Sequence, residues 1–171
     1  IRRGGWGWHL ATLARVRGAL RAAHLGQTRN VPGGPAPDCS ALAVSTQDGA
    51  VLSLAQWRAA HPGQPVALHF WAEWCPICKL EEHSVSRVSR DWPVLTVAMQ
   101  SGDVAAVRRT LAQRGLNWPT VIDADGALAA RYGFRAVPAF VAIDPAGRIS
   151  ATSVGYTSEI GMRLRLWWAR L

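Results

Sequence analysis

The chain has 171 residues, of which 49% are hydrophobic, so it is long enough to form one globular domain with its own core. The net charge is +8, but residues 1–38 contribute +5 of it through six arginines and a single acid. The remainder is only mildly basic and lacks a basic face interleaved with aromatic residues, which argues against a nucleic-acid-binding protein.

Residues 1–36 form a basic arm that ends in a linker rich in proline and glycine. No stretch of the arm reaches the roughly 18 uncharged apolar residues that a spanning helix needs. Its arginines and tryptophans fit a helix on a membrane surface, and they also fit a disordered arm that is processed or not native. We favour the second interpretation and place the folded domain at residues 37–171.

The first elements of this domain are a hairpin and a short helix. Residues 42–45 and 50–52 alternate in polarity around an Asp48-Gly49 turn, which predicts two paired strands. Ser53 is the expected N-cap of a helix over residues 54–60. The spare thiol, Cys39, precedes them; it could be exposed and reactive, pair between chains, or be buried as a small apolar residue, and burial is the commonest case.

An apolar run over residues 66–72 predicts a buried strand that leads directly into Cys75-Pro76-Ile77-Cys78 and a helix. With Cys75 at the N-cap, Cys78 lies one turn later on the same helix face, within reach of a disulfide. The helix start favours the thiolate of Cys75, the expected nucleophile, and leaves Cys78 to resolve the intermediate. Pro76 takes the first helical position, where a proline loses no hydrogen bond.

Further elements follow in a strand–helix pattern. We expect strands at residues 94–100 and 118–123, a helix capped by Asp103 over 103–114, and a short helix over 128–132. An apolar strand then begins at Pro138, and another spans residues 148–156. The last helix is capped by Thr157 or Ser158. Its helical spacing predicts that one set of apolar residues faces the sheet: Ile160, Leu164, Trp167 or Trp168, and Leu171.

The residues around the cysteines resemble the thioredoxin-like family. The Phe-Trp-Ala-Glu-Trp-Cys run at 70–75 is similar to thioredoxin, and the Pro-Ile dipeptide with the charged residues after it resembles the periplasmic TlpA/ResA group. The run at 161–168 is most similar to the copper-sensitivity suppressor (ScsD-like) oxidoreductases. The resemblance implies an α/β thioredoxin-like fold, with a central mixed sheet flanked by helices, an N-terminal hairpin extension and a central insertion.

The resemblance also implies site residues beyond the two cysteines. Val137-Pro138 matches the cis-proline segment that binds an extended substrate. Trp74 and Pro76 adjoin the cysteines and are expected to tune them. His69 occupies the position of a buried acid in thioredoxin, where it could move the proton of the resolving thiol or, as we favour, be a hydrogen-bonded buried side chain.

Two acids follow the second cysteine in the helix. Glu81 matches a position that tunes the cysteine pair in the TlpA/ResA group, where a carboxylate opposes thiolate formation. A solvated helix face is the alternative; for Glu81 the two interpretations stay open. For Glu82 we expect the solvated face.

These features predict a disulfide oxidoreductase that acts on cysteines of envelope proteins, without metal or organic cofactor, and is reset by a membrane thiol–disulfide partner. The resemblance implies a periplasmic location, with tethering through the N-terminus in the full-length protein. A cytochrome c maturation reductase is an alternative, although Ala139 replaces the acid that follows the proline in that branch. A metal-binding module is another, with Cys75, Cys78 and His83 as ligands and Cys39 or His69 as a fourth.

Overall fold

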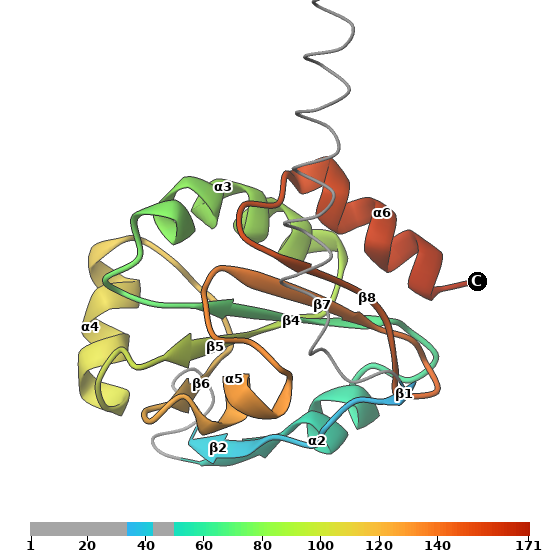
Figure 1. The fold of residues 1–171 in the computed structure, drawn as a ribbon, viewed down its shortest axis with the longest axis horizontal. Coiled ribbons are helices and arrows are strands. Elements are labelled where there is room, and N and C mark those ends of the chain that lie inside the picture. Colours follow the sequence, from blue (N-terminus) through green and yellow to red (C-terminus); the bar gives the residue numbers. More distant parts are fainter. Residues whose placement is uncertain (1–33, 43–49) are drawn as a thin grey trace, which may run out of the picture.

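The computed structural model describes residues 34–42 and 50–171, and its centre is a mixed six-stranded sheet (Figure 1). The strand order is β1-β8-β7-β4-β5-β6. Strands β4, β5 and β6 are parallel, whereas β7 and β8 run antiparallel to their neighbours. The strands are β1 (Gly34–Pro35), β4 (Val66–Trp71), β5 (Val94–Met99), β6 (Thr120–Asp123), β7 (Ala139–Ile143) and β8 (Arg148–Val154).

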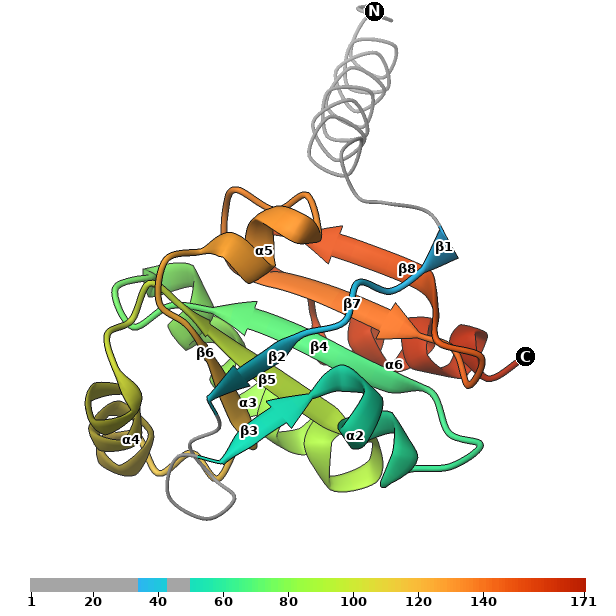
Figure 2. The same cartoon turned by 90° about the horizontal axis from the view of Figure 1, so that it is seen from below.

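Helices cover both faces of the sheet. One face packs against α3 (Pro76–Asp91), α4 (Val104–Gln113) and α6 (Glu159–Ala169). The other face packs against α2 (Leu54–Ala59), α5 (Ala127–Arg131) and the hairpin of β2 (Ser40–Leu42) and β3 (Val51–Ser53), as Figure 2 shows. The predicted fold class, a mixed sheet flanked by helices, is confirmed.

Strand β4 is buried on both sides because both faces of the sheet are covered. Side chains alternate along a strand, so Ala67 and Trp71 join the core under α3, α4 and α6, whereas Leu68 and Phe70 join the opposite core. By the same alternation His69 points toward α3. The strand therefore carries a histidine into an otherwise apolar layer beneath the helix that begins at Cys75.

The predicted hairpin is present, and it begins two residues earlier than expected. Strands β2 and β3 pair Ser40 with Ser53, whereas the expected Asp-Gly turn lies outside the described residues. Ser53 caps α2 as predicted: its Oγ accepts the Gln56 N–H at 3.0 Å, and the Gln56 side chain accepts the Ser53 N–H at 2.8 Å. The described end of the predicted linker, Gly34–Pro35, pairs with β8.

The predictions for the basic arm fall on residues 1–33, which lie outside the described residues. Within residues 34–42 and 50–171, no helix has the length and apolar character needed to cross a membrane.

The predicted buried face of α6 is wrong. Met162, Leu166 and Ala169 face the sheet, and the apolar residues expected there are exposed: Ile160, Leu164, Trp167, Trp168 and Leu171. The helix carries two apolar stripes with similar spacing, so periodicity could not choose between them. Packing on the sheet decides the rotation, because Met162, Leu166 and Ala169 enter the core. In this rotation Arg163 of α6 also donates to Asp91 of α3 at 2.7 Å.

Candidate active site

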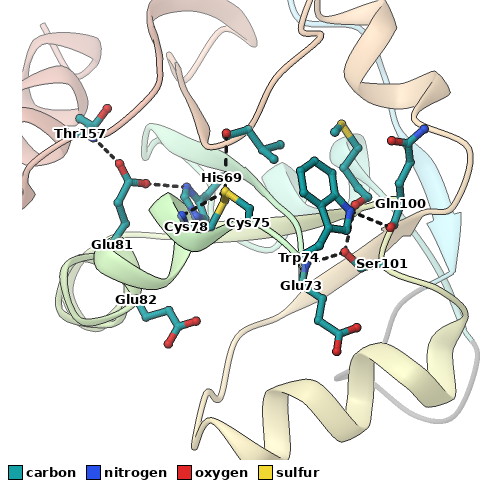
Figure 3. The surroundings of a disulfide bond; sticks show 12 residues. His69, Glu73, Trp74, Cys75, Cys78, Glu81, Glu82, Gln100, Ser101 and Thr157 are labelled. Carbon is teal, nitrogen blue, oxygen red and sulfur yellow. Dashed lines mark hydrogen bonds and ion pairs between the residues drawn. A yellow bond between two sulfur atoms is a disulfide. The ribbon is translucent and has the colours of Figure 1, made fainter.

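The two motif cysteines form a disulfide at the start of α3, with their Cα atoms 5.3 Å apart (Figure 3). Cys75 is the N-cap residue in an extended conformation, and Pro76 is the first helical residue, as predicted. The Cys78 N–H donates to Cys75 Sγ at 3.1 Å. Cys75 is therefore placed where unpaired amide groups of the helix start favour a developing thiolate.

The loop before Cys75 is fixed to the chain that follows β5. The Glu73 N–H donates to Ser101 Oγ at 2.9 Å, and Trp74 Nε1 donates to the Gln100 carbonyl oxygen at 3.1 Å. The Trp74 side chain is nevertheless 59% exposed. Trp74 thus combines an anchored indole N–H with an apolar surface beside the disulfide.

Arg114, which sequence reasoning missed, joins both sides of the motif. Its Nη2 donates to the Glu73 carbonyl oxygen at 2.9 Å, and its Nη1 donates to Glu82 Oε1 at 2.8 Å. The expectation that Glu82 lies on a solvated face is therefore wrong, because Arg114 from the end of α4 partly covers it. No local pattern around Arg114 indicates a partner so distant in the sequence.

The bond between Val137 and Pro138 is cis, as the resemblance implied. The Val137 carbonyl oxygen lies 3.6 Å from Cys75 Sγ. A sulfur in a disulfide carries no proton, so this is a contact in the oxidised form and can become a hydrogen bond once Cys75 is reduced. The Gly155 N–H donates to the Pro138 carbonyl oxygen at 2.8 Å, which connects this segment to the loop after β8.

Beneath the disulfide lie two buried ionisable side chains, His69 from β4 and Glu81 from α3. Glu81 Oε2 is 4.0 Å from His69 Nδ1, and its other oxygen accepts the Thr157 N–H (Figure 3). Neither His69 nitrogen has a hydrogen-bond partner within the described part of the chain. The favoured interpretation of His69 as a hydrogen-bonded side chain is therefore wrong, and the solvated-face alternative for Glu81 is wrong as well.

Burial changes the ionisation of both groups. It raises the pKa of Glu81 from 4.5 to about 7, against the smaller lowering by the Thr157 N–H. It lowers the pKa of His69 from 6.5 to about 3, so the imidazole is neutral at physiological pH. The edge contact between His69 and Trp118, at 6.0 Å between ring centroids, shows the apolar surroundings responsible. Glu81 can thus gain or lose a proton near neutral pH.

The third cysteine lies on the other side of the sheet. Cys39 is buried in the core with α2 and α5, and burial raises its pKa to about 11. The expected burial of Cys39 is confirmed. The ligand set of the metal-binding alternative is not brought together, because Cys39 is across the sheet from the disulfide and His83 is exposed on α3. Within the described ranges, no cluster of three or more His, Cys, Asp or Glu side chains could hold a metal.

Exposed apolar side chains surround the disulfide. Trp74 precedes it, and Ile77 and Leu80 are exposed on the first turns of α3. Tyr156 is also exposed, on the loop whose neighbouring residues bond to Pro138 and Glu81. By contrast, a cavity of about 580 Å³ lies at the far end of α3 between Trp57, Trp92 and Trp118, and it contains neither cysteine. The two cysteines are themselves buried, and exposed apolar side chains lie next to them in the chain.

A comparison with protein families finds that residues 32–152 match the family described as AhpC/TSA. The chain is 38% identical over 81 residues to the soluble secreted antigen MPT53 of Mycobacterium tuberculosis, covering 46% of this chain and 47% of that protein. It is 29% identical over 101 residues to the thiol-disulfide oxidoreductase ResA of Bacillus subtilis, covering 57% and 56%. The chain thus spans about half the length of these curated relatives.

Among solved structures, the exposed lipoprotein thioredoxin Etrx1 of Streptococcus pneumoniae aligns with a TM-score of 0.63 and 26% identity. The alignment covers 77% of this chain and 98% of that one. The thioredoxin-like fold is therefore shared over nearly the whole of a solved relative.

Proposed function

We propose, from the premise that the chain belongs to the AhpC/TSA family, that it is a thiol–disulfide oxidoreductase acting on cysteines of extracytoplasmic proteins. The observation that carries this proposal is the disulfide at the start of α3, with Cys75 Sγ 3.6 Å from the carbonyl oxygen before a cis-proline. A nucleophilic sulfur, a resolving sulfur and a substrate-binding backbone segment are then adjacent.

In the reductive direction, the Cys75 thiolate attacks one sulfur of a substrate disulfide and displaces the other sulfur as a thiolate. Cys78 then loses its proton and attacks Cys75 Sγ, which releases the second substrate sulfur. The substrate gains two electrons and the protein is left with the Cys75–Cys78 disulfide. The oxidative direction reverses every step. The helix start stabilises the Cys75 thiolate in both directions.

The substrate is an extended polypeptide with apolar residues near its cysteine. Backbone groups of Val137 pair with its main chain, and the exposed side chains of Trp74, Ile77 and Tyr156 contact its apolar residues. Pro76 keeps the first helical turn free of an N–H that would need a partner. The exposed side chains of Trp74, Ile77 and Tyr156 support a protein substrate over a small molecule, since small-molecule sites are usually concave and enclosed.

Glu81 and His69 handle the proton of the resolving cysteine. Glu81 is one helical turn after Cys78 on the same face, and its raised pKa of about 7 lets it accept or return a proton near neutral pH. Neutral His69 lies 4.0 Å from this carboxyl group, so a small movement of the two side chains would let it accept a hydrogen bond from the protonated form. Both side chains are buried, which limits the exchange of this proton with bulk water.

The relatives support a location outside the cytoplasm, since one is named a secreted antigen and another an exposed lipoprotein. We propose a periplasmic location with tethering through the N-terminus, and a membrane thiol–disulfide protein that resets the disulfide after each cycle. The Cys-Pro-Ile-Cys sequence is the part of the site that such a partner would contact.

The test is disulfide exchange with insulin and with a reduced, unfolded secreted protein as substrates. Cys75→Ser should abolish exchange, and Cys78→Ser should accumulate a mixed disulfide that mass spectrometry detects through Cys75. Cys39→Ser is the matched control, because its thiol lies across the sheet, and should exchange at the wild-type rate. Undiminished exchange by Cys75→Ser would overturn the proposal.

A further inference from the structure

The exposed apolar residues of α6 form a second surface, separate from the one around the disulfide. We define the α6 stripe as the side chains of Ile160, Leu164, Trp167, Trp168 and Leu171, all of them exposed. At 100° per residue these positions fall within an arc of about 100° on the helix. Leu171 follows the helix, but its N–H donates to the Trp168 carbonyl oxygen at 3.2 Å and keeps it on this path.

The sheet does not need this stripe, because Met162, Leu166 and Ala169 on the opposite side already supply the buried contacts of α6. An apolar stripe of this length, exposed to water on a helix whose opposite side packs on the sheet, marks an interaction surface. Its composition indicates the partner, since adjacent tryptophans with flanking arginines are typical of helices that lie at a membrane–water interface.

The charged residues near the α6 stripe suit binding to a lipid surface with anionic headgroups. The acids nearest the stripe are already neutralised: Glu159 pairs with Arg87 and Arg163, and Asp91 also pairs with Arg163. Arg170 is exposed beside the tryptophans and has no carboxylate partner in the described ranges. It can therefore contact a headgroup phosphate while the neighbouring indoles enter the apolar boundary.

The tryptophan end of α6 lies at the end of the sheet opposite the disulfide. Arg170 lines a cavity with Pro65, which precedes β4, and with Trp92, which follows α3. Cys75 is at the other end of both elements, since it follows β4 and begins α3. A six-residue strand spans roughly 20 Å, so a surface bound at the tryptophan end leaves the disulfide about that far away and facing water.

The basic arm joins the fold at this same end. Gly34 pairs with Ile149 at the start of β8, Ile149 lies beside Ile143 of β7, and Ile143 pairs with Val66 at the start of β4. Figures 1 and 2 both show β1 and the C-terminus at one end of the molecule. Residues 1–33 hold six arginines, two tryptophans and no acid.

We propose that the α6 stripe binds the surface of an anionic lipid bilayer and orients the disulfide toward the aqueous side. This surface is distinct from tethering through the N-terminus, because it uses the last helix of the folded domain. The stripe would hold the domain against the bilayer and limit the directions from which partner proteins reach Cys75.

The test is co-sedimentation of the 1–171 chain with vesicles of phosphatidylglycerol and phosphatidylcholine in equal parts. The wild type should bind, and Trp167→Ser/Trp168→Ser should lower its partition coefficient at least about tenfold, from the apolar burial that each indole loses. Arg170→Gln should lower binding about fivefold on these vesicles and have little effect at high salt. Brominated lipids should quench tryptophan fluorescence more in the wild type than in the double variant.

Trp74→Ser is the matched control, because Trp74 is as exposed as the stripe tryptophans but lies at the disulfide end; it should bind vesicles like the wild type. The double variant should keep the wild-type thermal midpoint and rate of disulfide exchange, which excludes misfolding. Three results would overturn the proposal: no vesicle binding by the wild type, equal binding by the double variant, or a dimer in analytical ultracentrifugation that the double variant dissociates.

Discussion

Cys75 and Cys39 are almost equally hidden from solvent, with 3% and 1% of their surfaces exposed, yet their surroundings differ in every other respect. Cys75 begins a helix, accepts the Cys78 N–H and touches the Val137 carbonyl oxygen. Cys39 lies in an apolar core across the sheet, where burial raises its pKa to about 11.

The comparison teaches that burial alone does not decide the role of a cysteine. Desolvation opposes the thiolate of any buried thiol, and only local donors and a helix start can offset it. Cys75 has both, together with a second sulfur one turn away and a strip of exposed apolar surface beside it. Backbone amides of Leu54 and Cys39 lower the pKa of the Cys39 thiol, but burial outweighs them. Cys39 has no helix start and no second sulfur, and it contributes as a small apolar side chain.

The largest expected difference between the two regions is in thiol reactivity. In the reduced protein at neutral pH, iodoacetamide should alkylate Cys75 at least about a thousandfold faster than Cys39. With a pKa of about 11, only about one Cys39 thiol in ten thousand is ionised at pH 7, and the core also excludes the reagent. Mass spectrometry of the labelled peptides measures both rates in one sample. Comparable alkylation rates for Cys75 and Cys39 would show that their environments do not differ in thiol reactivity.

The buried acid beneath the disulfide should appear in the pH dependence of stability. Folded Glu81 holds its proton up to a pKa of about 7, whereas the unfolded chain releases it near 4.5, so its contribution to stability is lost as pH rises between these values. The free energy of unfolding of Glu81→Gln, relative to that of the wild type, should therefore rise by up to about 3 kcal/mol as pH increases from 4.5 to 7. Urea unfolding of the oxidised proteins across this range measures the difference.

His69 gives the opposite slope. Its pKa falls from 6.5 to about 3 on folding, so its contribution is present above pH 6.5 and is lost as pH falls toward 3. His69→Leu should be increasingly more stable than wild type as pH falls below 6.5. The same urea series measures it, and a variant that follows the wild-type pH profile would show that burial does not control this histidine.

A smaller effect on stability and exchange is expected at Arg114, which contacts the loop before Cys75 and, in the described ranges, has no contact with the surroundings of Cys39. Arg114→Leu should lower stability by about 1–2 kcal/mol and slow disulfide exchange several-fold, because the Glu73 carbonyl oxygen and Glu82 lose their donor. Arg109→Leu, an exposed arginine on the same helix, is the control and should change neither quantity. Equal effects of the two substitutions would show that Arg114 does not position the loop.

The smallest effect is expected on the Cys39 side. Cys39→Ala removes one buried sulfur and should lower stability by about 1 kcal/mol with no change in exchange rate. Thermal unfolding and the insulin assay measure the two quantities. A slower exchange in this variant would mean that the two cysteine environments are coupled through the sheet.

Much of the fold and part of the site could be predicted from the sequence because the signals are local. The apolar run before Cys75, the spacing of the cysteines and Pro76 together specify a strand, a helix start and a disulfide within about ten residues. The N-caps at Ser53 and Asp103 are similarly local, and the structure has both. The roles of Val137 and Pro138 in substrate binding remain predictions.

The errors come from contacts between residues distant in sequence. The partner of Glu82 is Arg114 at the end of another helix, and the buried stripe of α6 depends on how the helix packs on the sheet. Periodicity shows that a helix has an apolar stripe, but it cannot rank two stripes of similar spacing. The sequence also could not predict that His69 lacks a hydrogen-bond partner in the described part of the chain, because such partners are known only once the strands and helices are packed.

The central claim is best tested by the reduction potential of the Cys75–Cys78 pair, measured by equilibration with glutathione and dithiothreitol buffers. The account predicts one two-electron transition that depends on both cysteines and is unchanged in Cys39→Ser. Reduction potentials of thioredoxin-like proteins span roughly 150 mV from reductants to oxidants. The measured potential therefore assigns the direction of exchange. A pair that never closes into a disulfide in any of these buffers would contradict the account.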